Sequence, residues 1–209
     1  MHRIPRRVVV TGVGIVSPLG CGNVSIWDKI IGGSSGVGAL PPSASVEQAG
    51  VHVAATVPHG DLLDEFDERR IFGRIVSKEQ SKFIQYANYA SDIALQHAGN
   101  PLVSATYDAT RAGVAIASGI GSLDEITGAA KTLDQSYRKL SPYFIPKILV
   151  NLAAGQVSVR HKLQGPCHSA VTACAAGAHS VGDASNFIKL GYADLMLAGR
   201  FTWVITTIR

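Results

Sequence analysis

The chain alternates short apolar runs with segments of helical periodicity. Four runs predict buried strands because they are rich in β-branched or small apolar residues and are bounded by glycine or polar residues. These runs are residues 7–12, 113–118, 169–173 and 194–199. Near-continuous apolar strands are typical of a parallel sheet that is covered on both faces.

Helix starts are predicted between these runs. Ser77 with Gln80, and Ser122 with Glu125, have the spacing of a capping box, in which side chains satisfy free amides. Pro146 suits the first turn of a third helix. The apolar face of that helix is formed by Leu149, Leu152, Ala153 and Val157. Because parallel strands need helical crossovers, this alternation predicts an α/β fold with a mostly parallel sheet.

Residues 32–70 break the alternation. The segment holds a glycine- and serine-rich stretch over residues 32–36, a Pro-Pro pair and an acidic stretch from Asp61 to Glu68. We interpret it as a surface excursion around one short strand, Val51 to Val57.

Composition narrows the function classes. With 46% hydrophobic and 16% charged residues, the chain is typical of a compact globular protein. The formal charge of +4 comes from scattered Lys and Arg without interleaved aromatic residues, so we predict no nucleic-acid surface. Every apolar run is interrupted well before the roughly 20 residues that a membrane span needs. We therefore predict no membrane span, and the basic start lacks the apolar core of a secretory signal.

Three cysteines are present, Cys21, Cys167 and Cys174. An odd number without a C-x-x-C pair disfavours both a disulfide framework and a metal site, and it fits a reducing compartment. One of the three is therefore a candidate working thiol.

The stretch from Gly165 to His179 is the most informative. It predicts a strand that turns sharply at Cys174 into a helix, which ends near Leu190 with Gly191 as its stop. Small residues recur along this helix, so we expect it to pack closely and to be buried. The residues with helical spacing are Ala175, Ala178, Val181, Ser185 and Ile188.

A cysteine at a strand-to-helix turn lies beside free amides and the positive end of the helix dipole, which stabilise thiolate over thiol. The same amides can hold the oxyanion that forms when a thioester is attacked, as at the nucleophile elbow of serine hydrolases. Two readings of Cys174 stay open: a nucleophile, or a small buried apolar side chain.

Neither neighbouring histidine is well placed as a base for this cysteine. His179 is five residues along the helix, roughly 140° around its axis from Cys174. His168 precedes the strand and lies about a strand length away. We expect both to be packing or hydrogen-bonded residues.

Two glycine patterns match nucleotide-binding loops only in part. Gly12-Val13-Gly14 is followed by Ser17 and Pro18 where a third glycine and a helix start are required. The pattern Gly119-Ile120-Gly121 also lacks its last glycine. We therefore predict no dinucleotide site.

Three segments, in order, resemble the condensing-enzyme branch of the thiolase superfamily. They are Arg7 to Gly20, Ser141 to Asn151, and Gly165-Pro166 leading to Thr172-Ala173-Cys174. From about Arg6 to Gly199 the chain is similar to the β-ketoacyl-[acyl-carrier-protein] synthase II pattern, in particular its mitochondrial and plant forms. The resemblance implies a thiolase-like α/β fold, with residues 6–199 as the first of the family's two halves and helices on both faces of the sheet.

The family carries out decarboxylative condensation of an acyl thioester with malonyl-carrier, and the resemblance implies that Cys174 takes the acyl chain from a carrier phosphopantetheine. Its own amide would be one of two oxyanion donors. Ile120 matches a position of the acyl pocket, and Phe144 matches one that reaches the pocket of the other subunit. Lys78 and Lys82 match basic positions that dock the acidic acyl carrier protein. Without the resemblance, both lysines are solvated helix charges.

The chain departs from the family after Gly199. The family's second half supplies two histidines, a lysine and a glycine-rich loop, and no matching segment follows here. Residues 200–209, Arg200 to Arg209, look unrelated to the family's continuation and suggest an alternative transcript, a retained intron or a misassigned gene end. Because Phe201 to Ile208 is apolar and β-prone, we expect it to promote aggregation.

Three functional hypotheses follow. By resemblance, the chain is a β-ketoacyl synthase of fatty acid biosynthesis, with no cofactor beyond the carrier's phosphopantetheine. The second hypothesis is a truncated, non-catalytic product that occupies a dimer interface or the carrier protein. The third, a free-standing cysteine acyltransferase or hydrolase, requires a local base that the sequence does not offer. The resemblance also implies a homodimer in the mitochondrion, with cytoplasm and plastid as alternatives.

Overall fold

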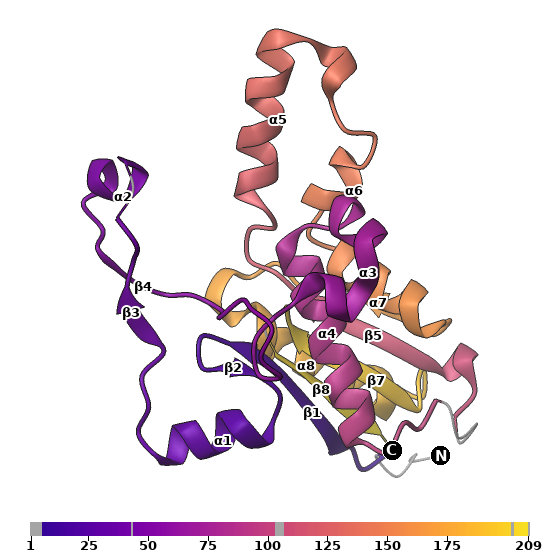
Figure 1. Ribbon diagram of the computed structural model, residues 1–209. Coiled ribbons are helices and arrows are strands. Elements are labelled where there is room, and N and C mark those ends of the chain that lie inside the picture. Colours follow the sequence, from indigo (N-terminus) through magenta and orange to yellow (C-terminus); the bar gives the residue numbers. More distant parts are fainter. Residues whose placement is uncertain (1–5, 43, 103–106, 202, 209) are drawn as a thin grey trace.

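The computed structural model describes residues 6–42, 44–102, 107–201 and 203–208 (Figure 1). Its central strands are β1 (Val9–Ser17), β2 (Gly20–Cys21), β5 (Ala112–Ala117), β6 (Cys167–His168), β7 (Leu195–Arg200) and β8 (Trp203–Ile208). They form one sheet in the order β2-β1-β8-β7-β5-β6. Strands β1, β7, β5 and β6 run in one direction, and β2 and β8 run against them. The prediction of a mostly parallel sheet is confirmed.

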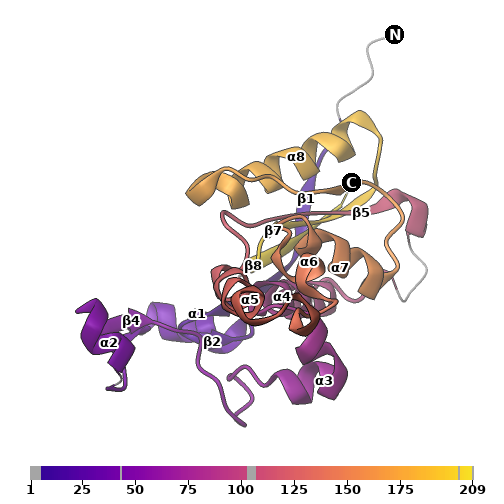
Figure 2. The same cartoon turned by 90° about the horizontal axis from the view of Figure 1, so that it is seen from above.

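Helices cover both faces of this sheet, as Figure 2 shows. Helices α4 (Lys82–His97) and α7 (Leu152–His161) pack on one face, and α8 (Ala176–Leu190) packs on the other. The remaining helices are α1 (Val24–Ile31), α2 (Ala44–Ala49), α3 (Glu68–Glu79), α5 (Leu123–Gln135) and α6 (Phe144–Ile148). Short 3-10 turns lie at Ala109–Arg111, Tyr137–Lys139 and Ala173–Ala175. The α/β fold class is therefore confirmed.

Strands β5 and β7 show why both faces need cover. Val114 and Leu197 belong to the core under α4 and α7, whereas Ala115 and Met196 belong to the core under α8. All four side chains are fully buried. Because successive side chains of a strand point to opposite faces, an apolar run without alternation requires a helix on each side.

The first glycine pattern serves packing. Helix α4 crosses β1 so closely that a Cβ on Gly14 would lie 1.9 Å from the carbonyl oxygen of Ala90. A Cβ on Gly12 would lie 2.1 Å from the carbonyl oxygen of Ala94. Only glycine allows this approach of helix to strand.

The predicted helix starts had mixed outcomes. Ser122 occupies the N-cap position of α5, as predicted, although its side chain makes no capping hydrogen bond. The predicted start at Ser77 is wrong, because α4 begins at Lys82 after Ser81. Ser77 lies within α3, and its side chain is outside the described part of the structure.

The helix predicted after Pro146 is two helices. Pro146 lies in the first turn of α6, as predicted, but the chain becomes extended at Leu149 and α7 starts at Leu152. The carbonyl of Lys147 accepts a hydrogen bond from the Ser81 hydroxyl at 2.8 Å. This tertiary hydrogen bond uses a carbonyl that a longer helix would need for its own ladder.

Residues 32–70 form the expected excursion. Two short strands, β3 (Val37–Ala39) and β4 (Val53–Ala55), pair with each other, and α2 connects them. Figure 1 shows this ribbon projecting from the body. The predicted strand over 51–57 contains β4, whereas β3 was not predicted.

The segment after Gly199 lies inside the sheet. Strand β8 pairs with β7 on one side and with β1 on the other. Val204 to Thr207 are buried. The prediction that this segment is β-prone is confirmed. Because it pairs with a neighbouring strand on each side, neither of its edges is left open.

Candidate active site

Cys174 lies in the 3-10 turn between β6 and α8. Strand β6 ends at His168, so the predicted strand over 169–173 is wrong. The apolar run fails to extend the strand because β6 is the edge of the sheet and, in the described residues, pairs only with β5. Val171 is exposed as a result.

The turn at the cysteine is sharp, as predicted. Ala173 has a φ of 48°, in the left-handed region that costs a non-glycine residue roughly 1–2 kcal/mol. The carbonyls of Thr172 and Ala173 accept hydrogen bonds from the amides of Ala175 and Ala176. The amide of Cys174 lies outside this ladder and can therefore donate to a ligand.

Cys174 opens into a cavity of about 470 Å³. The cavity lies at the carboxyl ends of β5 and β7, the edge at which open α/β sheets bind ligands. Its walls are the loop and helix start at 118–124, the first residues of α4, the turn at Cys174, and the end of β7 with Phe201. The cysteine is thus an exposed thiol in a concave site rather than a buried apolar residue.

The loop after β5 packs against the sharp turn that carries Cys174. Ser118 is buried, and its hydroxyl accepts a hydrogen bond from the amide of Gly121 at 3.1 Å. Gly119 lies against the elbow, since a Cβ there would be 3.4 Å from the Cα of Ala173. The second glycine pattern therefore shapes the cavity wall.

Helix α8 buries a different face from the predicted one. Its buried residues are Ala176, Gly177, Ser180, Ala184 and Ile188. Of the predicted set only Ile188 is buried, while Ala175 and Ala178 are exposed and Val181 and Ser185 are half-buried. The error arises because small residues occur all around the helix, so that docking on β7 and β5 selects the face.

Both histidines near the cysteine have partners of their own. The Nε2 atom of His168 lies 3.1 Å from a carboxylate oxygen of Asp183. The Nδ1 atom of His179 lies 2.7 Å from the hydroxyl of Thr172. The prediction that they are hydrogen-bonded residues is confirmed, and neither lines the cavity.

The other two thiols are poor candidates for the nucleophile. Burial is the main cause that raises the pKa of Cys21 to about 11, and partial desolvation by neighbouring atoms raises the pKa of Cys167, although its side chain is exposed. Neither lines the cavity that Cys174 opens into. A raised pKa leaves less thiolate, which is the reactive form.

The structure brings two of the other predicted site residues to the cysteine. Ile120 and Lys82 line the same cavity. Lys82 is also paired with Glu68, with 2.5 Å between nitrogen and oxygen. Phe144, at the start of α6, and Lys78, exposed at the end of α3, do not line it.

Three further wall residues were not singled out from the sequence as site residues. Phe83 and Tyr86 come from α4, and Arg200 comes from the end of β7. Burial is the main cause that raises the pKa of Tyr86 to about 12, so its hydroxyl stays protonated at neutral pH. In the sequence, Arg200 is marked only as the first residue of the segment that looks unrelated to the family's continuation.

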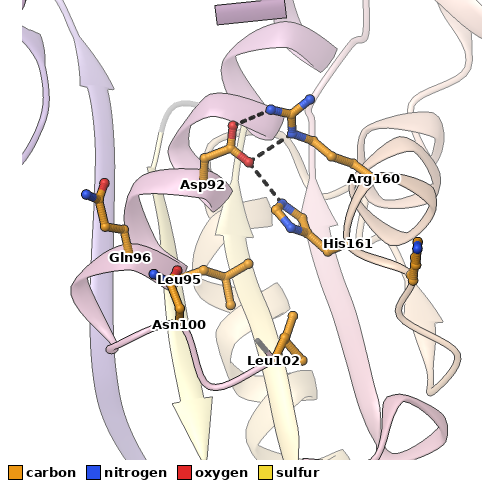
Figure 3. A pocket seen from close by; sticks show the side chains of 8 residues that line it. Asp92, Leu95, Gln96, Asn100, Leu102, Arg160 and His161 are labelled. Carbon is orange, nitrogen blue, oxygen red and sulfur yellow. Dashed lines mark hydrogen bonds and ion pairs between the residues drawn. The ribbon is translucent and has the colours of Figure 1, made fainter. Parts of the chain in front are cut away.

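A second cavity, of about 480 Å³, lies between the ends of α4 and α7 (Figure 3). Asp92 accepts two hydrogen bonds from Arg160, at 2.9 and 2.7 Å, and lies 3.2 Å from Nε2 of His161. Burial acts to raise the pKa of Asp92, but its contacts with His161 and Arg160 outweigh burial and lower that pKa. The central charges of this cavity are therefore paired with one another.

The described residues form neither a metal-binding cluster nor a membrane-spanning helix. No group of three or more His, Cys, Asp or Glu side chains there could hold a metal ion. None of the described helices has the length and apolar character to cross a membrane.

Residues 5–208 match the family described as "Beta-ketoacyl synthase, N-terminal domain". Over 93% of its length, the chain is 48% identical to 3-oxoacyl-[acyl-carrier-protein] synthase 2 of Rhizobium meliloti. It is 44% identical to the mitochondrial 3-oxoacyl-[acyl-carrier-protein] synthase of Arabidopsis thaliana, again over 93% of its length. The chain spans 46% and 44% of the length of these two relatives.

A solved structure with a similar fold is a β-ketoacyl synthase from Burkholderia phymatum. It is 26% identical, with a TM-score of 0.78, and the match covers 92% of this chain and 46% of that one. The family match includes β8, so it extends beyond the predicted boundary at residue 199. The chain therefore belongs to the β-ketoacyl synthase family, as its N-terminal domain.

Proposed function

We propose that Cys174 accepts an acyl group from a carrier-bound thioester, as the first half-reaction of a β-ketoacyl synthase. The observation that carries the proposal is an exposed thiol at a strained turn, opening into a cavity of about 470 Å³. The free amide of Cys174 points to the same chemistry, because it can stabilise the oxyanion of a tetrahedral intermediate.

In this step the thiolate of Cys174 attacks the thioester carbonyl. A new carbon–sulfur bond forms to Cys174, the bond to the phosphopantetheine sulfur breaks, and the departing sulfur takes up a proton from solvent. Acyl transfer of this kind requires no cofactor apart from the carrier's own phosphopantetheine.

The condensation with malonyl-carrier is proposed for the whole protein, in fatty acid biosynthesis. The resemblance assigns malonyl decarboxylation to histidines of the family's second half, beyond the residues of this chain. His168 and His179 do not replace them, since both are bound to other side chains. The hypothesis of a hydrolase with a local base therefore loses its candidate bases.

Ile120 and Phe144 are proposed specificity residues for the acyl chain. Ile120 is 65% exposed on the wall of the cysteine cavity, where an acyl chain would cover it. Phe144 lies outside the cavity of its own chain. That position fits the proposed homodimer, in which the residue reaches the pocket of the other subunit.

Lys78 and Lys82 are proposed to dock an acidic acyl carrier protein near the cavity. Lys78 is exposed, and the side chain of Lys82 is 52% exposed. Exposed lysines attract acidic partners mainly through long-range electrostatics. Location in the mitochondrion is also proposed, because the relatives at this level of identity include a mitochondrial one.

The test uses the chain with an acyl-carrier thioester and intact mass spectrometry. Wild type is expected to gain one acyl group, and Cys174→Ala none. The matched control is Cys167→Ala, which removes the other exposed thiol and should load like wild type. Equal loading of Cys174→Ala would contradict the proposal, and absence of loading in wild type would favour a non-catalytic binder.

A further inference from the structure

Arg200 has an unusual position in the cysteine cavity. It ends β7 beside the end of β5, where it pairs with Ala117, and the amide of Phe201 donates to the Ala117 carbonyl at 3.3 Å. Its side chain lines the same cavity as Cys174. A fixed positive charge is thus built into the wall of a site that holds a nucleophile.

The guanidinium has no anionic partner in the described parts of the chain. Its central carbon lies 4.9 Å from the centre of the Phe201 ring, and its Nε atom is buried without a hydrogen-bond acceptor. By contrast, Arg111 and Arg160 are paired with Asp194 and Asp92. A buried donor left unsatisfied costs about 1–3 kcal/mol, and no described side chain offsets this cost.

The other charges on the cavity wall are Lys82 and Asp124. Lys82 already forms an ion pair with Glu68. Asp124 lies in the first turn of α5, where the helix dipole favours a carboxylate, and it makes no ion pair with Arg200. The positive charge of Arg200 is therefore not compensated by a contact within the cavity.

We propose that Arg200 forms a subsite for a carboxylate beside Cys174, so that the cavity favours reactants carrying a negative charge near the carbon that the thiol attacks. The proposal rests on the proposed function, in which Cys174 is the reacting thiol. It adds the ligand class, an organic carboxylate, that the site recognises. A planar guanidinium with several donors suits a carboxylate through two parallel hydrogen bonds.

Two alkylating agents of similar size test this subsite, iodoacetate and the neutral iodoacetamide. In both reactions the sulfur of Cys174 displaces iodide, a carbon–sulfur bond forms, and the thiol proton goes to the buffer. The rates are measured by mass spectrometry in a Cys167→Ala background, so that the exposed Cys167 does not contribute. The quantity that decides is the ratio of the iodoacetate rate to the iodoacetamide rate.

Arg200→Gln is expected to lower this ratio about three- to tenfold, since a hydrogen bond to a charged group is lost. In Arg200→Lys the ratio should fall less than in Arg200→Gln, because lysine retains the positive charge. The control is Arg138→Gln, because Arg138 also lies over an aromatic ring, Tyr137, but outside this cavity. An equal fall of both rates in Arg200→Gln would overturn the proposal and assign Arg200 a role in folding or in thiol reactivity.

A second measurement needs no variant of Arg200. Raising the salt concentration to about 1 M, where the Debye length is about 3 Å, should lower the iodoacetate rate and leave the iodoacetamide rate unchanged. A ratio that does not fall with salt would overturn the subsite. Both tests use small reagents, so they can fail while acyl transfer from the carrier succeeds, and the reverse holds as well.

Discussion

The cavity at Cys174 and the cavity at Asp92 are nearly equal in size but opposite in character. The cavity at Cys174 holds an exposed thiol, apolar walls and an Arg200 without an ion pair. The cavity at Asp92 holds a carboxylate that two neighbouring basic residues, Arg160 and His161, already occupy (Figure 3).

The difference shows that charged groups paired with one another stabilise the fold, whereas unpaired groups remain available to a ligand. In the Asp92 cavity the charged groups join α4 to α7 and hold the two helices together. In the Cys174 cavity the reactive groups face open space at the carboxyl ends of β5 and β7. We therefore expect substitutions in the first cavity to change stability and substitutions in the second to change reactivity.

The largest expected effect is on stability at Asp92. Asp92→Ala should lower the free energy of unfolding by about 2–3 kcal/mol, because it leaves two partly buried basic side chains without their acceptor. Cys174→Ala should change it by no more than about 0.5 kcal/mol, because that side chain is exposed. Urea unfolding of both variants measures the two changes in the free energy of unfolding. Equal decreases in the two variants would contradict the expected difference between the cavities.

The stability that Asp92 contributes should depend on pH. The pKa of Asp92 is lowered in the folded state, so its contribution is present above the unfolded pKa of about 3.9 and is lost as pH falls through the folded value. The stability difference between wild type and Asp92→Asn should therefore shrink at pH values below about 4. Urea unfolding at a series of pH values tests the sign, and a difference that grows on acidification would contradict it.

The strained turn before Cys174 should give a smaller effect. Ala173→Gly is expected to raise the free energy of unfolding by about 1 kcal/mol, because glycine adopts the left-handed region without the cost that alanine bears. Ala178→Gly is a matched control, since Ala178 lies in the regular part of α8 and should lose stability. A loss of stability in both variants would show that the turn is not strained.

The smallest expected effect is on carrier docking at the rim of the cysteine cavity. Lys78→Gln and Lys82→Gln should each weaken binding of an acidic carrier protein by about twofold to fivefold at low salt, since single exposed charges contribute about 0.2–1 kcal/mol. The control is Lys189→Gln, because Lys189 is exposed at the far end of α8. Binding isotherms that show no difference among the three variants would favour the reading of solvated helix charges.

Much of the fold could be read from the sequence because its signals are local. The apolar runs at 113–118 and 194–199 correspond to β5 and β7, and Ser122 to the N-cap of α5. The position of Cys174 at a turn into a helix also followed from residue order, whereas its exposure came only from the structure. Each of these features depends on a few neighbouring residues and on backbone preferences that act without the rest of the chain.

Other features depend on partners that are distant in sequence. The run at 169–173 has strand character but no neighbouring strand, whereas β8 gains partners on both edges. The carbonyl of Lys147, near the break between α6 and α7, accepts a hydrogen bond from the distant Ser81. These hydrogen bonds join residues that are distant in sequence, so residue order alone does not predict them.

The sequence by itself therefore determined the types of element, the α/β class and the thiol at the elbow. Only the tertiary structure decided that Arg200, 26 residues after Cys174 in the printed sequence, lies in the same cavity, and that Arg160 and His161 face Asp92. The physical reason is that periodicity and capping act within a few residues, whereas a cavity is formed by strand ends and helix ends that meet only when the sheet assembles.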